Sequence, residues 1–388
     1  NFMNRPAILG GNPTFSPPVP FVKPLLPAYE DMEVQLKDIF SSGMLTKGKY
    51  LKEYEGHLKE YLSVDNAIGV SSCTLGLIVV LHALDLKGEV IVPSFTFPST
   101  VHAIMWNNLK PVFVDCDPET FNVIPSKVEE AITSQTSAIL AVHVFGNPAE
   151  VEALEDIAIR YDLKLIFDSA HGFGSELNGK PLGKCGNAEV FSTSPTKLLV
   201  TGEGGVITTE DGELAEKIRT GIEYGNPGDY DCLFKGLNAR LAEFNSLTGI
   251  YSLKRLNENA KLRNHLASVY KQYLSHIPGI SFQKINPSGK SSYKDFSILI
   301  EPSFCLSRDL LYKALEAEGV VTRKYFYPNH RQKALKNIDM TCKLPFTDEV
   351  SEKVICLPIY SSMTEDMIKT VSAVIYNIYE ARDDIKNI

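Results

Sequence analysis

The sequence predicts an α/β protein with a mostly parallel central sheet sandwiched by helices and a smaller C-terminal α+β domain. Two observations predict this class. Short apolar segments of strand length recur between residues 67 and 208. Amphipathic helical patterns separate several of them. Because alternating strands and helices build parallel sheets that are covered on both faces, the two patterns together favour an α/β domain.

The N-terminal two thirds of the chain supplies most of these elements. Residues 1–28 are rich in proline and predict an extended arm, and the segment 41–43 (Ser-Ser-Gly) is a helix stop. Helices are expected at residues 29–40, 49–62, 75–84, 100–107 and 151–161. Strands are expected at residues 67–70, 90–92, 111–114, 138–142, 163–167, 189–191 and 206–208.

The C-terminal third has a different pattern. One long helical stretch is expected over residues 239–274. A strand at 296–300 and helices at 308–318 and 364–381 follow it. The sequence therefore predicts an N-terminal arm (1–28), a large domain (29–250) and a small C-terminal domain (251–388).

Composition narrows the class of protein. The 388 residues carry a net charge of −8 with a pI near 5.6, which argues against a nucleic-acid-binding protein. The seven cysteines are dispersed without a CxxC pair, which favours reduced thiols over a disulfide framework or a zinc site. From this cysteine pattern we expect a cytoplasmic protein without a metal. We expect no membrane partner, because no apolar run has the length of a membrane span.

A lysine and an aspartate follow apolar segments. Lys197 stands between the hydroxyl-rich residues 192–196 and the glycine-rich residues 201–205, and Asp168 ends the apolar segment 163–167. An isolated lysine is ordinarily solvated, and Asp168 could instead cap a following helix. A desolvated amine and a buried acid together favour Schiff-base chemistry on pyridoxal 5'-phosphate, in which the acid keeps the pyridine nitrogen protonated.

Other segments could complete such a site. Hydroxyl groups in the turn Ser72-Cys73-Thr74 precede a helix, and a helix N-terminus with hydroxyls can bind phosphate. Ser192 could add a hydroxyl, Phe97 could stack on the ring, and His171 could contact the ring or its phenolic oxygen. The alternatives are a simple helix cap, a core aromatic and a packed loop histidine.

Taken together, these segments closely resemble the DegT/DnrJ/EryC1/StrS family of sugar aminotransferases, which have the aspartate-aminotransferase (type I) fold of pyridoxal-phosphate enzymes. The resemblance covers residues 24 to 379. It is carried by the segments 41–48 (SSGMLTKG), 70–74 (VSSCT), 93–97 (PSFTF), 145–148 (FGNP), 168–171 (DSAH), 192–197 (STSPTK), 236–238 (GLN), 323–330 (RKYFYPNH) and 356–358 (CLP).

The resemblance implies a function and a role for each matching residue. It implies ping-pong transamination of a nucleotide-linked keto sugar, with L-glutamate as amino donor and Lys197 as the internal aldimine lysine. Asp168 would pair with the pyridinium, and Asn238 would reach the phosphate of the neighbouring subunit's cofactor in a homodimer. Tyr325 and His330 fall in a segment that lines the substrate cleft. The remaining cofactor contacts would be Ser72, Cys73, Thr74, Phe97, His171 and Ser192.

The chain departs from the family pattern at a few positions, and other functions stay open. Cys73 replaces a glycine, and Glu243 stands where aspartate is commoner. A cyclitol aminotransferase would use the same residues on a carbocyclic ketone. A non-catalytic regulatory protein is disfavoured because Lys197 and Asp168 are both present. A lyase or dehydratase of similar fold would release no 2-oxoacid from glutamate.

Overall fold

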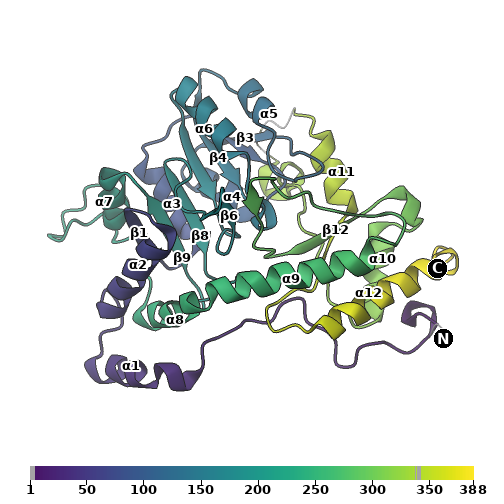
Figure 1. The fold of residues 1–388 in the computed structure, drawn as a ribbon. Coiled ribbons are helices and arrows are strands. Elements are labelled where there is room, and N and C mark those ends of the chain that lie inside the picture. Colours follow the sequence, from purple (N-terminus) through teal and green to yellow (C-terminus); the bar gives the residue numbers. More distant parts are fainter. Residues whose placement is uncertain (1–4, 337, 339–341) are drawn as a thin grey trace.

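A seven-stranded sheet forms the centre of the computed structural model, which describes residues 5–336, 338 and 342–388. Its strand order is β1-β9-β8-β5-β4-β2-β3, and helices cover it on both sides (Figure 1). The strands are β1 (Asn66–Val70), β2 (Glu89–Pro93), β3 (Lys110–Val114), β4 (Thr136–Val142), β5 (Lys164–Asp168), β8 (Ala188–Ser192) and β9 (Gly205–Thr209). The predicted α/β class is confirmed.

The sheet is parallel except at one strand. β3, β2, β4, β5 and β8 run parallel, whereas β9 is antiparallel to both β8 and β1. Because β8 and β9 are antiparallel neighbours, the chain between them must turn back at the carboxyl end of β8. That turn contains Lys197, and ligands of α/β sheets bind at this edge.

Helices pack on the two faces of this sheet through separate apolar clusters. In β5, Phe167 belongs to one cluster and its neighbour Ile166 to the other, as expected from the alternation of side chains along a strand. One face carries α2 (Lys49–Leu62), α5 (Pro125–Glu130), α6 (Val151–Arg160) and α8 (Glu243–Lys254). The other carries α3 (Cys73–Ala83), α4 (Pro98–Trp106) and α7 (Gly212–Gly221). α1 (Tyr29–Ser42) packs against α8.

The C-terminal part forms its own apolar cluster around an antiparallel sheet in the order β10-β12-β13. Its strands are β10 (Ile280–Phe282), β12 (Phe296–Ile300) and β13 (Val354–Leu357). Its helices are α9 (Leu256–Leu274), α10 (Arg308–Ala317), α11 (Pro345–Lys353), α12 (Glu365–Glu380) and α13 (Arg382–Ile385). Short 3-10 turns lie at Ala7–Leu9, Val144–Gly146, Pro302–Phe304, Asn329–Arg331 and Lys333–Leu335.

The single helix predicted over residues 239–274 is wrong. Helix α8 begins at Glu243, and Arg255 separates it from α9. The N–H of Glu243 donates to the carbonyl of Leu45, so the residues before it follow an extended path. The break has a packing reason, because α8 buries its side chains in the large-domain core and most of α9 packs on the C-terminal cluster.

Two further contacts join parts of the chain that are distant in sequence. The small sheet β11-β6-β7 pairs β11 (Gly289–Lys290) with β6 (Glu176–Leu177), which in turn pairs with β7 (Lys180–Pro181). The N-terminal arm runs along the C-terminal part (Figure 1), where the Thr14 hydroxyl donates to Glu318 over 2.6 Å. The domain boundaries at residues 28 and 250 stay predictions.

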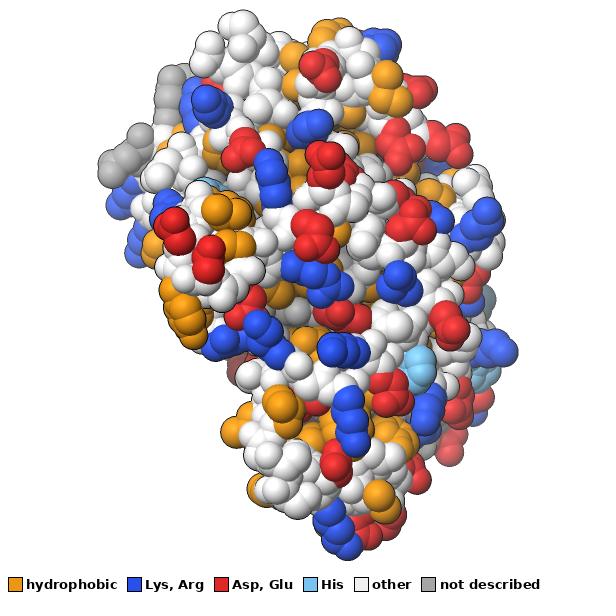
Figure 2. Space-filling model, turned by 90° about the vertical axis from the view of Figure 1, so that its left-hand side faces the viewer, with side chains coloured by type: hydrophobic (Ala, Val, Ile, Leu, Met, Phe, Trp, Pro, Cys, Tyr) orange, Lys and Arg blue, Asp and Glu red, His pale blue; other side chains and the backbone are white. Residues whose placement is uncertain are grey.

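The face of the molecule in Figure 2 mixes acidic and basic side chains with scattered hydrophobic ones. Within the described part of the chain, no helix combines the length and apolar character that a membrane crossing needs.

Candidate active site

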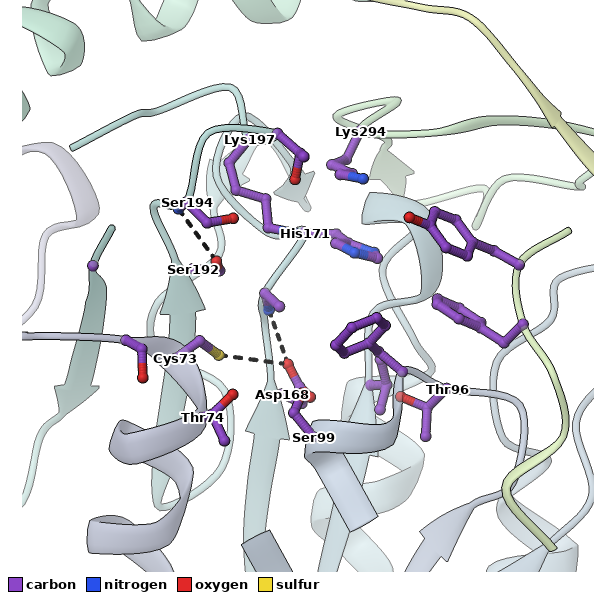
Figure 3. Close-up of a pocket in the computed structure, with 18 of the residues that line it drawn as sticks. Cys73, Thr74, Thr96, Ser99, Asp168, His171, Ser192, Ser194, Lys197 and Lys294 are labelled. Atoms are coloured by element: carbon purple, nitrogen blue, oxygen red, sulfur yellow. Dashed lines mark hydrogen bonds between the residues drawn. The ribbon is translucent and has the colours of Figure 1, made fainter. Parts of the chain in front are cut away.

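A cavity of about 340 Å³ lies at the carboxyl edge of the central sheet. It gathers residues from seven regions of the chain that are distant in sequence (Figure 3). Of the residues predicted from the sequence, those that line it are Ser72, Cys73, Thr74, Phe97, Asp168, His171, Ser192, Lys197 and Tyr325. The fold therefore brings most of the residues selected from the sequence to one cavity.

Lys197 lies in the turn between β8 and β9, and this turn is closed by its own hydrogen bonds. The N–H of Thr201 donates to the Thr193 carbonyl over 2.9 Å, and their hydroxyls are 2.7 Å apart. Burial, and after it the positive charge of Lys294, lowers the pKa of Lys197 to about 7. An amine with such a pKa is about half neutral at pH 7 and can act as a nucleophile.

Asp168 forms the floor of the cavity at the end of β5. Its side chain is 3% exposed and accepts hydrogen bonds from the Thr100 hydroxyl (2.6 Å) and the Ala170 N–H (3.1 Å). Burial raises its pKa, which the hydrogen bonds partly oppose. The residues after it form turns rather than a helix, so Asp168 is not a helix cap. Such a buried carboxylate fits a cationic ring nitrogen.

A second buried carboxylate holds the strand end that carries Asp168. Glu189 in β8 accepts a hydrogen bond of 2.5 Å from the hydroxyl of Ser169. It also accepts from the N–H groups of Gly183 and Cys185, over 2.7 and 2.8 Å. Because Ser169 is the neighbour of Asp168, these bonds fix the backbone from which the floor of the cavity projects.

His171 stands on the wall of the cavity as a neutral ring. Its Nδ1 accepts from the Phe145 N–H over 3.1 Å, which leaves the proton on Nε2. The ring is nearly parallel to that of Phe326, with an interplanar angle of 10°. Burial, and then the charges of Lys197 and Lys294, lower the pKa of His171 well below its ordinary value. It can therefore donate a hydrogen bond into the cavity.

The N-terminus of α3 supplies the phosphate-binding features predicted for the turn 72–74. Ser72 caps the helix by accepting from the Leu75 N–H over 3.1 Å. Opposite it, a Cβ at Gly205 would lie only 2.7 Å from the Cys73 nitrogen, so the two backbones approach closely. Ser192 and Ser194 line the same end of the cavity. Backbone donors and hydroxyls at a helix N-terminus suit a phosphate group.

Two predicted residues lie outside this cavity. Asn238 is exposed, and its backbone pairs with Glu223. His330 is held between the Ser94 hydroxyl, 2.7 Å from Nδ1, and the carboxylate of Asp348, 3.1 Å from Nε2. Their predicted contacts with the neighbouring cofactor and with the substrate stay predictions.

Sequence reasoning missed several residues that line the cavity, and Lys294 is the most consequential. The polar segment 291–295 predicts a solvated loop lysine, yet Lys294 is only 5% exposed. Its position two residues before the apolar strand β12 was the signal that the sequence offered. The other missed residues are Thr96, Ser99, Val142, Ala170, Thr196, Glu203, Gly204 and Phe326.

The cavity fits the cofactor that the sequence pattern implies. The buried amine of Lys197 suits the aldehyde of pyridoxal 5'-phosphate, and the N-terminus of α3 with its hydroxyls suits the phosphate. The carboxylate of Asp168, whose hydrogen bonds come from a hydroxyl, a backbone N–H and a thiol, suits the ring nitrogen. Phe97 adds an aromatic face, 52% exposed, beside them.

Comparisons with known proteins agree with this geometry. The sequence model of the DegT/DnrJ/EryC1/StrS aminotransferase family matches residues 28–376. The dTDP-4-amino-4,6-dideoxy-D-glucose transaminase of Escherichia coli is 34% identical over 91% of this chain and 97% of its own. The GDP-perosamine synthase of Vibrio cholerae is 28% identical over 92% and 99%. The structure of DesI with its TDP-sugar product has a TM-score of 0.93 at 31% identity, covering 98% of both chains.

Proposed function

Since this chain belongs to the DegT/DnrJ/EryC1/StrS aminotransferase family, we propose that it transfers the amino group of L-glutamate to a nucleotide-linked keto sugar. The chain is an aminotransferase and uses pyridoxal 5'-phosphate. The observation that carries the proposal is the shared cavity of Lys197 and Asp168. The relatives named for nucleotide-linked sugars support this substrate class. We also place the protein in the cytoplasm, on the dispersion of its cysteines.

Each residue has a task in this reaction. The cofactor, when bound, supplies the electron sink that allows an amino group to be exchanged for a carbonyl. The amine of Lys197 would hold the cofactor by its aldehyde and, once displaced, would carry the proton that leaves the substrate carbon. Asp168 keeps the ring nitrogen protonated. His171 Nε2 donates a hydrogen bond toward the ring, and the end of the cavity formed by residues 72–74 and 192 holds the phosphate.

Two experiments test the reaction. Adding L-glutamate to the loaded enzyme should change the absorbance of the bound cofactor and release 2-oxoglutarate, whereas Lys197→Ala should do neither. A panel of nucleotide-linked keto sugars and inosose-type ketones, with products identified by mass spectrometry, then tests the acceptor. Amination of the inososes alone would show a cyclitol aminotransferase and refute the proposed substrate class.

We include in the proposal a homodimer in which each site borrows Asn238 from the neighbouring subunit. Asn238 lies outside the cavity of its own chain, which supports this arrangement. Nearby side chains also leave apolar surface to be covered, since Trp106 is 71% exposed, Leu233 70% and Tyr230 89%. An apolar hollow of about 510 Å³ lies beside Trp106 and Gly236.

Mixed subunits test whether the sites are shared. Lys197→Ala and Asn238→Ala proteins are purified separately, then unfolded together and refolded. In a mixed dimer with shared sites, one site carries both substitutions and the other carries neither, so activity should reappear. If Asn238 serves its own subunit, no site is intact and the mixture should show no more activity than its parts. Light scattering on the wild type gives the subunit number independently.

A further inference from the structure

We propose that Lys294 is the residue that binds the α-carboxylate of the amino donor. The inference rests on the proposed function, because it takes an amino acid as the donor. Among the described lysines and arginines, those that line the cavity are Lys197 and Lys294. Lys197 is consumed by its bond to the cofactor. The ammonium of Lys294 is therefore the cation that remains for an anionic substrate group.

The position of Lys294 matches the geometry of an amino acid. In any α-amino acid the carboxyl carbon lies about 2.5 Å from the amino nitrogen, since one carbon separates them. The carboxylate of the donor must therefore lie beside the point where the Lys197 amine is replaced. Figure 3 shows Lys294 projecting into the space shared with Lys197 and His171. The charge of Lys294 also acts on the pKa of both residues.

The ammonium of Lys294 keeps donor capacity for a ligand. Its recorded hydrogen bonds go to the two carboxylate oxygens of Asp295, over 2.9 and 3.1 Å. An ammonium has three N–H donors, so this pair leaves at least one of them for another acceptor. The rings of Tyr325 and Phe21 lie 5.7 and 6.0 Å from the same nitrogen and restrict its position.

The backbone that carries Lys294 is fixed before any substrate arrives. Arg263 is buried and donates to the carbonyls of Tyr293 and Lys294, each over 3.1 Å. The Ser292 hydroxyl donates to the carbonyl of His171 over 2.7 Å, which ties this segment to the wall of the cavity. A pre-organised charge loses less conformational entropy on binding than a mobile surface lysine would.

The charge distribution in the cavity also favours a carboxylate at Lys294. The two acids that line the cavity are Asp168, on the floor, and Glu203, in the turn after Lys197. The diphosphate of a nucleotide sugar is a second anion, but it lies beyond the sugar ring from the carbon that reacts. Lys294 is 5% exposed and faces the reacting amine, so it suits the donor carboxylate better than an outlying diphosphate.

The role of Lys294 is tested by measuring separately the reaction with L-glutamate and the reaction with a nucleotide-linked amino sugar. The double variant Lys294→Met/Asp295→Asn removes the pair without leaving a buried charge alone. Its affinity for L-glutamate, followed by the absorbance of the cofactor, should fall about 10- to 100-fold, as expected for loss of a charged hydrogen bond. Its reaction with a nucleotide-linked amino sugar, which has no α-carboxylate, should stay close to that of the wild type. Lys294→Arg should retain part of the affinity for glutamate.

Controls keep the inference falsifiable. 2-Methylglutamate lacks the hydrogen that the transfer requires. The double variant should lose as much affinity for 2-methylglutamate as it loses for L-glutamate. Lys290→Met removes a half-exposed lysine from a pair with Glu176 and should change neither half-reaction. Equal losses in both half-reactions, or a larger loss with the amino sugar, would overturn the role of Lys294. Failure of the wild type to aminate any nucleotide-linked sugar would refute the proposed function but leave the glutamate result standing.

Discussion

Replacing Lys197 by methionine should stabilise the cofactor-free protein while abolishing its activity. The pKa of Lys197 falls from 10.5 to about 7 on folding, because burial disfavours the charged amine. The unfolded chain therefore holds the proton more strongly than the folded chain does. Below pH 7 both states are protonated, and the folded state bears the full cost of the buried charge.

The magnitude follows from the shift. A shift of one pKa unit corresponds to about 1.4 kcal/mol, so the penalty at neutral pH is on the order of 4 kcal/mol. The penalty shrinks as pH rises from 7 and vanishes above the pKa of the unfolded lysine, near 10.5. The Lys197→Met protein should consequently be more stable than wild type at pH 7, and the two should converge toward pH 10.

Denaturant unfolding of the two cofactor-free proteins between pH 6 and pH 10 measures this difference. Lys290→Met serves as the matched control, and its effect should be small and independent of pH. A methionine variant that is less stable than wild type at pH 7 would refute the reasoning. So would a stability difference that does not change with pH.

Three further substitutions have defined outcomes. Asp168→Asn should lower turnover at least about 100-fold, measured with glutamate and the best acceptor, because it removes the charge that pairs with the ring nitrogen. Glu243→Gln should lower the free energy of unfolding by about 2 kcal/mol, since Glu243 accepts from three N–H groups at the start of α2, whereas the exposed Glu216→Gln should not. Burial alone would raise the pKa of Glu189, but His143, Ser169 and backbone N–H groups hold it below its ordinary value. Glu189→Gln should therefore destabilise the protein at pH 7, and the loss should shrink on acidification below about pH 4, where the wild-type carboxylate also becomes protonated.

The parts of the site that could be predicted from the sequence are those where a local pattern carries the chemistry. Asp168 ends an apolar strand, and Lys197 sits in a turn between two strands, so neighbouring residues alone indicated that both side chains face a binding edge. The start and end of α2 were predicted at the residues where the structure has them, because its amphipathic pattern is unbroken.

The parts that could not be predicted depend on contacts between distant segments. The apolar strand that follows Lys294 does not show that the distant residues Arg263 and Phe21 will pack around it. The break at Arg255 has no proline or glycine to mark it, and the two helices that it separates pack mostly in different apolar cores. Helix α7 was not predicted, although Asp211 caps it by accepting from Glu213 and Leu214.

The hydrogen bond from Ser292 to the His171 carbonyl has a consequence for how this enzyme can diverge. The two residues lie 121 positions apart in sequence, yet their backbones are held at one distance. A substitution that displaces the segment around Lys294 would shift the wall that faces the cofactor as well. Selection for a new amino donor would thus also alter the contacts between the His171 segment and the cofactor. Lineages that change donors should carry paired substitutions in these two segments.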